Sequence, residues 1–433
     1  MVLKICESLF IAIIAVKKSE TGLWQIEHPC PQCGAPVILE ETDRLFFCSY
    51  CRIRLCLTSE DYFRYFLPPP QLPSKDILFV PYWRFKGMAF FCKADQVRYG
   101  VKDVNFLAST HTIFPHSLGL RPQVLTLRFV SPELEARFFS PEIPLRKVME
   151  RIDRQLQFQD ESDLSGPIFY RVFIGETASQ IYSPMYVQGH TFHDAILGRP
   201  IAPIAEHLLD GLLPFQQAKN WQIKFLPTMC PLCGWDLDGE RDSVVLLCKN
   251  CDSIWEATQK GFKQIEFGII PGKEEAVFYL PFWKMEAAIE DLEIQSPADW
   301  LRIAHGPKMI GGEREEPGLH FWTPAFKVPP ELFLRLTQQT TLSPLQGDIR
   351  KNFPKSPLYP ISLPVSEAAE SIKLLIAKIA VDKKILPKLN EMDVRLNQIQ
   401  LIYLPFLSTG NDLVQSQTRM SIPQNSLKLG RYL

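Results

Sequence analysis

Eight of the eleven cysteines in the chain form two clusters with the same internal spacing. In each cluster, two cysteines separated by two residues are followed, after fourteen intervening residues, by a second pair of the same kind. Thiolates are preferred ligands of Zn²⁺, and the two-residue gap lets both sulfurs of a pair face one ion. Each cluster is therefore predicted to bind one zinc ion, which makes two per chain. The predicted ligands are Cys30, Cys33, Cys48, Cys51, Cys230, Cys233, Cys248 and Cys251.

The residues around the cysteines predict the elements that hold them. Gly34 and Gly234 directly follow the first pair of each cluster, where the turn favours a positive φ. Residues 36–39 and 45–47 are predicted to be the two strands of a hairpin, and residues 243–247 repeat the second of them. This pattern, Cys-Pro-x-Cys-Gly followed by Cys-x-x-Cys, resembles the zinc-ribbon family in both clusters.

The resemblance implies metal binding but leaves the function open, because zinc ribbons occur in transcription factors, ribosomal proteins, helicases and enzyme accessory domains. Four cysteines fill a tetrahedral site and leave no position for a substrate, which favours a structural role. Two alternatives remain: rubredoxin-like iron sites, which would make this a redox protein, and disulfides. His28 and Cys56 are not expected to be ligands, because Thr228 and Glu256 stand at the equivalent places of the second cluster.

The repetition extends well beyond the cysteines. Trp24-Gln25-Ile26 precedes the first cluster and Trp221-Gln222-Ile223 the second. Residues 79–86 (FVPYWRFK) correspond to 279–286 (YLPFWKME), and residues 122–129 to 329–336. Repeated units of this length are domains rather than solenoid repeats, whose period is roughly 20–50 residues. We therefore predict two copies of one unit, 1–212 and 213–433, with insertions in the second copy near 337–364.

Each unit is predicted to be a zinc ribbon followed by a mainly antiparallel β domain with one or two helices, so the fold class is α+β and β-rich. In the run 82–86, Trp83 and Phe85 alternate with Arg84 and Lys86, which predicts one buried face and one wet face. Apolar residues at helical spacing predict helices around 145–152 and 366–379. Trp83 and its counterpart Trp283 are predicted to be core anchors that fasten each ribbon to its β domain; a platform for stacking a ligand is the alternative.

The predicted domains are an N-terminal strand segment (1–23), the first ribbon (24–58), its β-rich domain (59–212), the second ribbon with its lead-in (213–258) and its β-rich domain (259–433). The apolar run 9–16 is interpreted as a buried strand rather than part of a signal peptide, because Glu7 precedes it and Lys17 and Lys18 follow it. No apolar run reaches the ~20 residues of a membrane helix. Cysteines suited to a metal rather than to disulfides indicate a reducing compartment, hence the cytoplasm.

Charge limits the possible partners. The net charge of the 433 residues is −1, so no general positive field attracts nucleic acid. Residues 28–56 are neutral overall and carry a short basic edge, Arg44, Arg52 and Arg54, whereas residues 228–256 contain six acids and two bases. Because lysine and arginine displace the counterions of nucleic acid, only the first ribbon is a candidate for binding it.

Motifs of common reactive sites are absent. The chain contains no GxxxxGK[ST] or GxGxxG run for a nucleotide, and no GxSxG or HExxH. This leaves an enzyme open but favours a non-catalytic protein. We therefore predict a zinc-stabilised interaction or scaffold protein with a protein partner. A nucleic-acid-binding protein is the first alternative, and a redox protein with iron sites is the second.

Overall fold

The computed structural model describes residues 24–69, 77–119, 125–131, 134, 136–156, 167–204, 213–214, 223–272, 277–289, 319–380 and 383–433. The fold is β-rich, with 45% of the described residues in strands and 15% in helices, which confirms the predicted class. The predicted strand segment 1–23 lies outside the described residues. None of the described helices is both long and apolar enough to cross a membrane.

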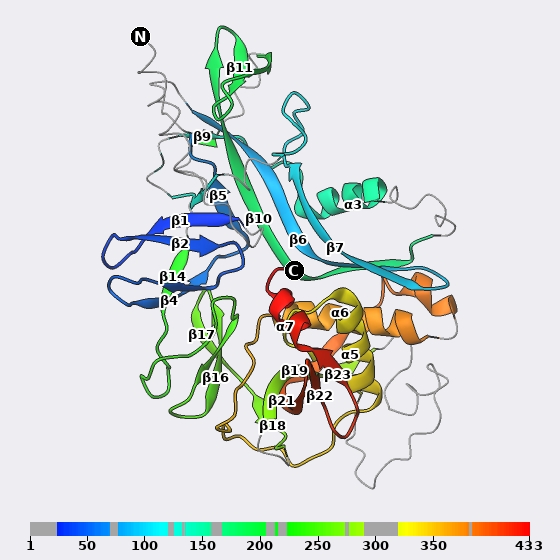
Figure 1. Cartoon of the computed structure of the whole chain (residues 1–433). Helices are drawn as coiled ribbons and strands as arrows, with labels where there is room; N and C mark the ends of the chain where they lie inside the picture. Colours follow the sequence, from blue (N-terminus) through cyan, green and yellow to red (C-terminus); the bar gives the residue numbers. More distant parts are fainter. Residues whose placement is uncertain are drawn as a thin grey trace.

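The first copy is built on three long antiparallel strands, β6 (Leu78–Cys92), β7 (Val97–Leu107) and β10 (Tyr170–Gln188), with β5 (Phe63–Phe66) parallel to β10 (Figure 1). Helix α3 (Leu145–Leu156) packs on this sheet through a cluster that contains Trp83, Val148 and Met149. The other strands of this part are β1 (Gln25–Pro29), β2 (Pro36–Glu40), β3 (Leu45–Phe47), β4 (Arg54–Thr58), β8 (Leu127–Phe129), β9 (Arg137–Phe138), β11 (Thr191–Asp194), β12 (Pro200–Pro203) and β13 (Leu213–Pro214).

The second copy repeats the same strand order. Strands β20 (His320–Pro324), β19 (Val277–Ala288), β21 (Arg395–Thr409) and β18 (Phe267–Ile269) are neighbours as β7, β6, β10 and β5 are, and β18 is again the parallel one. In both copies a small hairpin follows the third long strand, β11 with β12 and β22 (Asp412–Val414) with β23 (Ser421–Pro423). The remaining elements are β14 (Lys224–Pro227), β15 (Val245–Cys248), β16 (Ser253–Thr258), β17 (Gly261–Ile265), α5 (Pro330–Leu342), α6 (Val365–Ile379), the 3₁₀ helix η6 (Lys383–Lys388) and α7 (Gln424–Gly430).

The paired tryptophans occupy equivalent places in the two copies. Trp83 Nε1 donates to the carbonyl of Ile143 at 2.6 Å, and Trp283 Nε1 donates to the carbonyl of Leu363 at 2.9 Å. Each carbonyl lies two residues before the first residue of a helix, α3 in the first copy and α6 in the second. Both indoles are buried. The hydrogen bond of each tryptophan therefore fastens the start of a helix. Among the described residues, the hydrophobic cluster around Trp83 contains none of the first ribbon, whereas that of Trp283 includes Val245, Leu247 and Ile254 of the second.

One predicted correspondence does not hold. Residues 127–129 form strand β8, which pairs with β1 of the first ribbon and with β5. Residues 330–336, at the equivalent place in the sequence, belong to helix α5, which begins with a proline and packs on β20. There the hydroxyls of Thr340 and Thr341 donate to the Trp322 carbonyl. The first ribbon supplies a pairing partner for β8, and this difference in surroundings decides between strand and helix.

The face of β6 that we predicted to be wet is buried. Arg84 is 0% exposed and Lys86 is 6% exposed. The Arg84 guanidinium pairs with the Glu41 carboxylate at 3.0 Å, lies 4.0 Å from the centre of the Trp24 ring and also pairs with Asp103. A buried ion pair on β6 thus holds the first ribbon on the sheet.

One large hydrophobic cluster is shared by the two copies. The far halves of β6 and β10 extend over helices α5 and α6 of the second copy (Figure 1), and one cluster of buried residues contains side chains from both. The ring of Phe90 on β6 lies 6.1 Å from that of Phe333 on α5. The hydroxyl of Tyr170 on β10 donates to Glu370 of α6 at 3.3 Å. Helix α6 therefore packs on its own sheet and on that of the first copy.

Candidate metal centres

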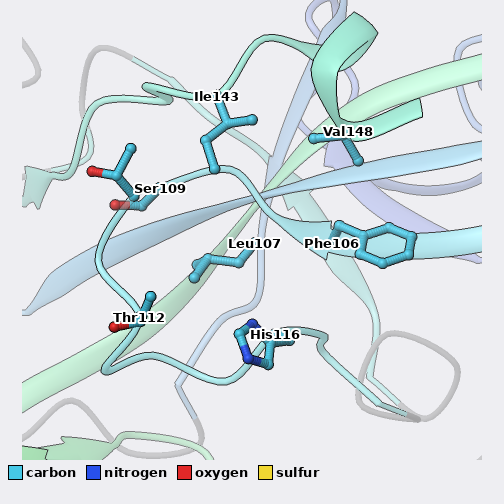
Figure 2. Close-up of a pocket in the computed structure, with 8 residues that line it drawn as sticks. Phe106, Leu107, Ser109, Thr112, His116, Ile143 and Val148 are labelled. Atoms are coloured by element: carbon cyan, nitrogen blue, oxygen red, sulfur yellow. The ribbon is translucent and has the colours of Figure 1, made fainter. Parts of the chain in front are cut away.

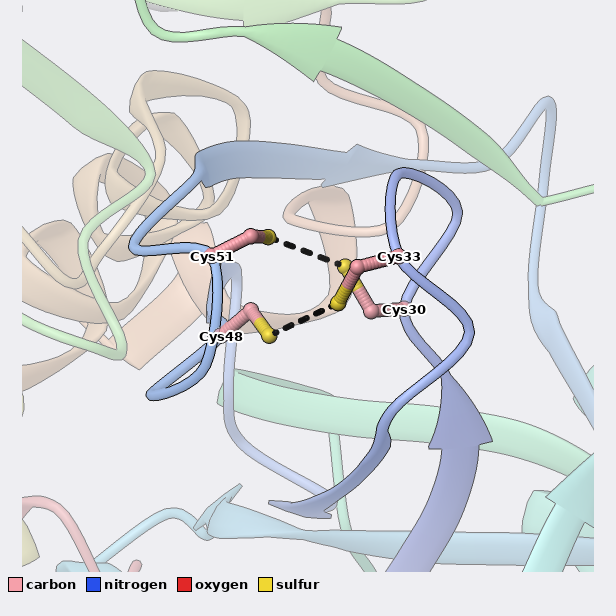
Figure 3. Close-up of side chains that lie close together, drawn as sticks. All are labelled: Cys30, Cys33, Cys48 and Cys51. Carbon is pink, nitrogen blue, oxygen red and sulfur yellow. Dashed lines mark hydrogen bonds between the residues drawn. The ribbon is translucent and has the colours of Figure 1, made fainter.

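The first four cysteines converge on one point at the ends of two short turns (Figure 3). The sulfurs of Cys30 and Cys51 are 3.7 Å apart, and those of Cys33 and Cys48 are 3.6 Å apart. A disulfide requires about 2.05 Å, so these sulfurs are not bonded to each other. A tetrahedron with metal–sulfur bonds of about 2.3 Å has edges of about 3.8 Å. The four sulfurs therefore fit a tetrahedral metal ion.

The second four cysteines have the same geometry. The sulfurs of Cys230 and Cys251 are 3.6 Å apart, and those of Cys233 and Cys248 are 3.5 Å apart. In each group all four sulfurs lie within 4.8 Å of one another. Zinc and iron form thiolate bonds of similar length, so this geometry supports a metal without naming it.

Tight turns through each cysteine pair, here called knuckles, aim the sulfurs. In the first knuckle of each ribbon, Gly34 has φ +74° and Gly234 has φ +72°, which confirms the predicted left-handed glycines. The amide of each glycine donates to the carbonyl of the first cysteine, Cys30 or Cys230. In the second knuckles the left-handed position is held by Arg52 (φ 62°) and Asp252 (φ 46°). Sequence reasoning missed these two positions because neither is a glycine.

Each metal centre joins a buried part of the protein to an exposed one. Cys30, Cys48, Cys230 and Cys248 are at most 3% exposed, whereas Cys33, Cys51 and Cys233 are exposed. A bound ion would tie the outer knuckles to the core, which is the contribution of a structural site.

The two residues that we excluded as ligands have other roles. The Cys56 thiol is buried in β4, and burial raises its pKa to about 12. The ring of His28 stacks on Phe225 at 5.1 Å, and burial lowers its pKa. Neither belongs to a metal-binding group among the described residues.

The surroundings of the two centres differ at one side chain. The Ser253 hydroxyl lies 3.1 Å from Cys251 Sγ and accepts the indole N–H of Trp255 at 2.8 Å. The equivalent residues of the first ribbon, 200 positions earlier, are Ile53 and Leu55. The second centre thus has a hydroxyl beside a thiolate where the first has an apolar side chain, a difference that we did not anticipate.

The two ribbons are packed together. Strand β14, the lead-in of the second ribbon, pairs with β4 of the first, from Lys224 opposite Thr58 to Pro227 opposite Leu55. Segment 213–227, which we assigned to the second unit, therefore contributes its strands to the first. A shared cluster of buried side chains lies between the ribbons: Leu45, Cys56, Cys230, Leu237, Leu246, Cys248 and Trp255.

An acidic turn in the first ribbon is a junction for three other parts of the chain. Glu41 pairs with Arg84 of the sheet, and Asp43 accepts from Arg241 of the second ribbon at 2.6 Å. Arg431, just beyond α7, donates to Asp43 at 2.7 Å and to Glu40 at 3.0 Å. Burial raises the pKa of Asp43, while the Glu40 amide and the two guanidinium groups oppose that rise.

The three arginines of the predicted basic edge have different environments. Arg54 donates to the Gly239 carbonyl at 3.2 Å and lies 3.7 Å from Asp238, both in the second ribbon. Arg44 donates to carbonyls of its own turn and lies 5.1 Å from the Phe63 ring centre. Arg52 is exposed. Two of the three side chains are thus engaged within the protein.

A pocket of about 340 Å³ lies between the end of β7 and the start of α3 (Figure 2). Its walls are mainly apolar, from Phe106, Leu107, Ile143 and Val148, with Ser109, Thr112 and His116 at the side. The Ser109 hydroxyl donates to Glu142 at 3.4 Å. None of the eight cysteines lines this pocket, so it is separate from the metal centres.

Comparison of the chain with protein-family models gave no match, and searches of curated proteins and of solved structures gave none either.

Proposed function

We propose that both clusters hold structural zinc ions and that the protein is a non-catalytic scaffold that binds another protein through its ribbons. Thiolate ligands need a reducing compartment, so we place the protein in the cytoplasm. Closed four-cysteine sites supply no open coordination position, which supports a structural rather than a catalytic metal.

The proposal rests on the position of the exposed apolar side chains, half of which lie in the two ribbons. Twelve large hydrophobic residues are exposed among the described residues, and six of them belong to the two ribbons. Tyr50 is 71% exposed, Leu232 62% and Trp235 61%. Exposed apolar groups that gather in one region mark interaction sites. We call the following residues the knuckle surface: Phe47, Tyr50, Arg52, Met229, Leu232 and Trp235.

The packing of the ribbons supports a single continuous knuckle surface. Phe47 on β3 is opposite Arg54 on β4, and the Thr228 hydroxyl donates to the Arg54 carbonyl at 3.2 Å. Met229 follows Thr228 directly, and Figure 1 shows both ribbons on the same side of the molecule. Tryptophan, tyrosine and arginine are the residue types that dominate binding energy at protein interfaces.

The test is purification of the tagged full-length chain from the cells that make it, beside the double variant Tyr50→Ser and Trp235→Ser. We expect two equivalents of zinc, a colourless protein and a stoichiometric partner that the variant loses. Wild-type protein that repeatedly carries no partner argues against a scaffold. A coloured iron protein supports the redox alternative, and nucleic acid released by salt supports binding through Arg52.

A further inference from the structure

We propose that the second-ribbon half of the knuckle surface, Met229, Leu232 and Trp235, docks a basic protein segment. Such a segment carries lysine or arginine side chains next to an apolar one. This inference rests on the proposed scaffold function and names the chemistry of its partner.

The apolar part of the docking site is rigidly presented. Met229 forms an antiparallel bridge with Asp236, and the Cys230 amide donates to the Trp235 carbonyl at 2.7 Å. Met229 is 55% exposed, and Leu232 and Trp235 more so. A backbone turn that is already ordered loses little conformational freedom when a partner binds, which favours tight binding.

The stretch of sequence that carries these three residues, 228–256, is acidic, and of its six acids Asp238 is the one that pairs with Lys249 and lies near Arg54. Residues 228–256 are all described and contain two bases, and both are already paired with acids. Lys249 pairs with Asp238 at 2.6 Å, and Arg241 pairs with Asp43 of the first ribbon at 2.6 Å. A zinc ion held by four thiolates adds a formal charge of about −2. The acids of this stretch are Asp236, Asp238, Glu240, Asp242, Asp252 and Glu256.

The bridge places one of these carboxylates, that of Asp236, at the apolar site itself. Residues directly opposite in an antiparallel pair have Cβ atoms about 5 Å apart, so the exposed Asp236 carboxylate borders Met229. A basic group on the partner would meet a carboxylate there while its apolar neighbour covers Trp235. Nucleic acid would bring phosphates to the same carboxylates, and a second copy of this ribbon would bring like charge.

The experiment selects peptides from a random display library on the zinc-loaded full-length protein. We expect the enriched peptides to have net positive charge and at least one large apolar residue. Trp235→Ala is expected to weaken a selected peptide about 30-fold or more, the loss typical of a central interface residue. Asp236→Lys is expected to weaken it about tenfold, and added salt to weaken binding to the wild type.

Tyr99→Ala is the matched control, because it removes an exposed aromatic side chain of β7 that lies outside the knuckle surface. Metal content and circular dichroism establish that each variant is folded. Enriched peptides that are neutral or acidic overturn the inference and leave a scaffold function standing, as does binding that survives Trp235→Ala. A dimer that Trp235→Ala dissociates in analytical ultracentrifugation also overturns it. A library that yields no binder overturns the inference too. The proposed scaffold function is tested separately, by whether the protein purified from its native cells carries a partner.

Discussion

Ser253 makes the second metal centre chemically different from the first at the level of single residues. Its hydroxyl is beside the Cys251 sulfur and is oriented by the indole of Trp255. Groups that hydrogen-bond metal ligands orient them and tune their affinity for the ion. Ile53 offers no such bond in the first ribbon, so two centres with the same ligands need not hold metal equally well.

Ser253→Ala should therefore weaken zinc binding at the second centre, by roughly 10-fold or more. Competition with a chromophoric zinc chelator measures the two affinities. Ile53→Ala is the control at the equivalent position of the first ribbon, where we expect little change. Equal affinities of the second centre for zinc in wild type and Ser253→Ala would show that the hydroxyl does not contribute to metal binding.

The Arg84–Glu41 pair should contribute far more to the free energy of unfolding than an exposed ion pair of similar length. Removing one partner of a buried pair leaves the other charge uncompensated and costs about 3–5 kcal/mol. Glu41→Gln is expected to lower the free energy of unfolding in urea by the lower end of this range, about 3 kcal/mol, because Asp103 still pairs with Arg84. Glu27 and Arg128, 2.9 Å apart and partly exposed, form the matched control. Glu27→Gln should cost no more than about 1 kcal/mol, and equal losses would contradict the role of burial.

At the scale of elements, the pairing of β14 with β4 joins the stability of one ribbon to that of the other. In the sequence each ribbon carries its own four ligands, which predicts that Cys230→Ser unfolds only the second ribbon. The shared cluster contains Cys230 and Cys248 together with Leu45 and Cys56 of the first ribbon. Loss of the second ion should therefore loosen β4 as well.

We now expect Cys230→Ser to abolish zinc at the second centre and to raise hydrogen exchange in β4, Arg54–Thr58. Metal analysis and exchange mass spectrometry measure the two effects. Strand β7 is the internal control, because among the described strands it pairs with β6 and not with a strand of either ribbon. Unchanged protection of β4 would restore the picture of independent ribbons.

The predictions that succeeded at this scale depend on short spacing. Two residues between cysteines and a following glycine are enough to aim two sulfurs, and alternation over five residues is enough to place Trp83 inward. The prediction for Arg84 was wrong because the Glu41 turn that covers it is 43 residues away in the chain. Strand β8 pairs with β1 of the first ribbon, and no described ribbon strand lies beside α5 in the same way. The sequence near residues 329–336 contains no sign of this difference.

At the scale of the whole molecule, the common core predicts that the two copies unfold together. Phe90→Ala removes a fully buried ring that contacts α5 and should cost about 3–5 kcal/mol. The variant should also split a single calorimetric unfolding transition into two, because the lost contact lies between the two copies. Phe79→Ala, equally buried but within the first copy alone, should cost as much and keep one transition. Two transitions in the wild type would contradict the common core.

The duplication was visible in the sequence because both copies keep the same local motifs, whereas the way they join was not. Helix α6 was predicted from its apolar spacing, but its polar face also meets the first copy through Glu370 and Tyr170. A glutamate and a tyrosine 200 residues apart carry no local sign of contact. Packing between duplicated units depends on side chains that the repeat itself does not preserve.

The contact between Asp43 and Arg431 gives the protein an order of assembly during translation. The two residues are 388 positions apart. A ribosome that adds about 5–20 residues per second needs roughly 20–80 seconds to pass from one to the other. During that interval the acidic turn of the nascent chain lacks the guanidinium of Arg431. The four cysteines of the first ribbon can thus come together early, but the contacts of the acidic turn are complete only when Arg431 has emerged.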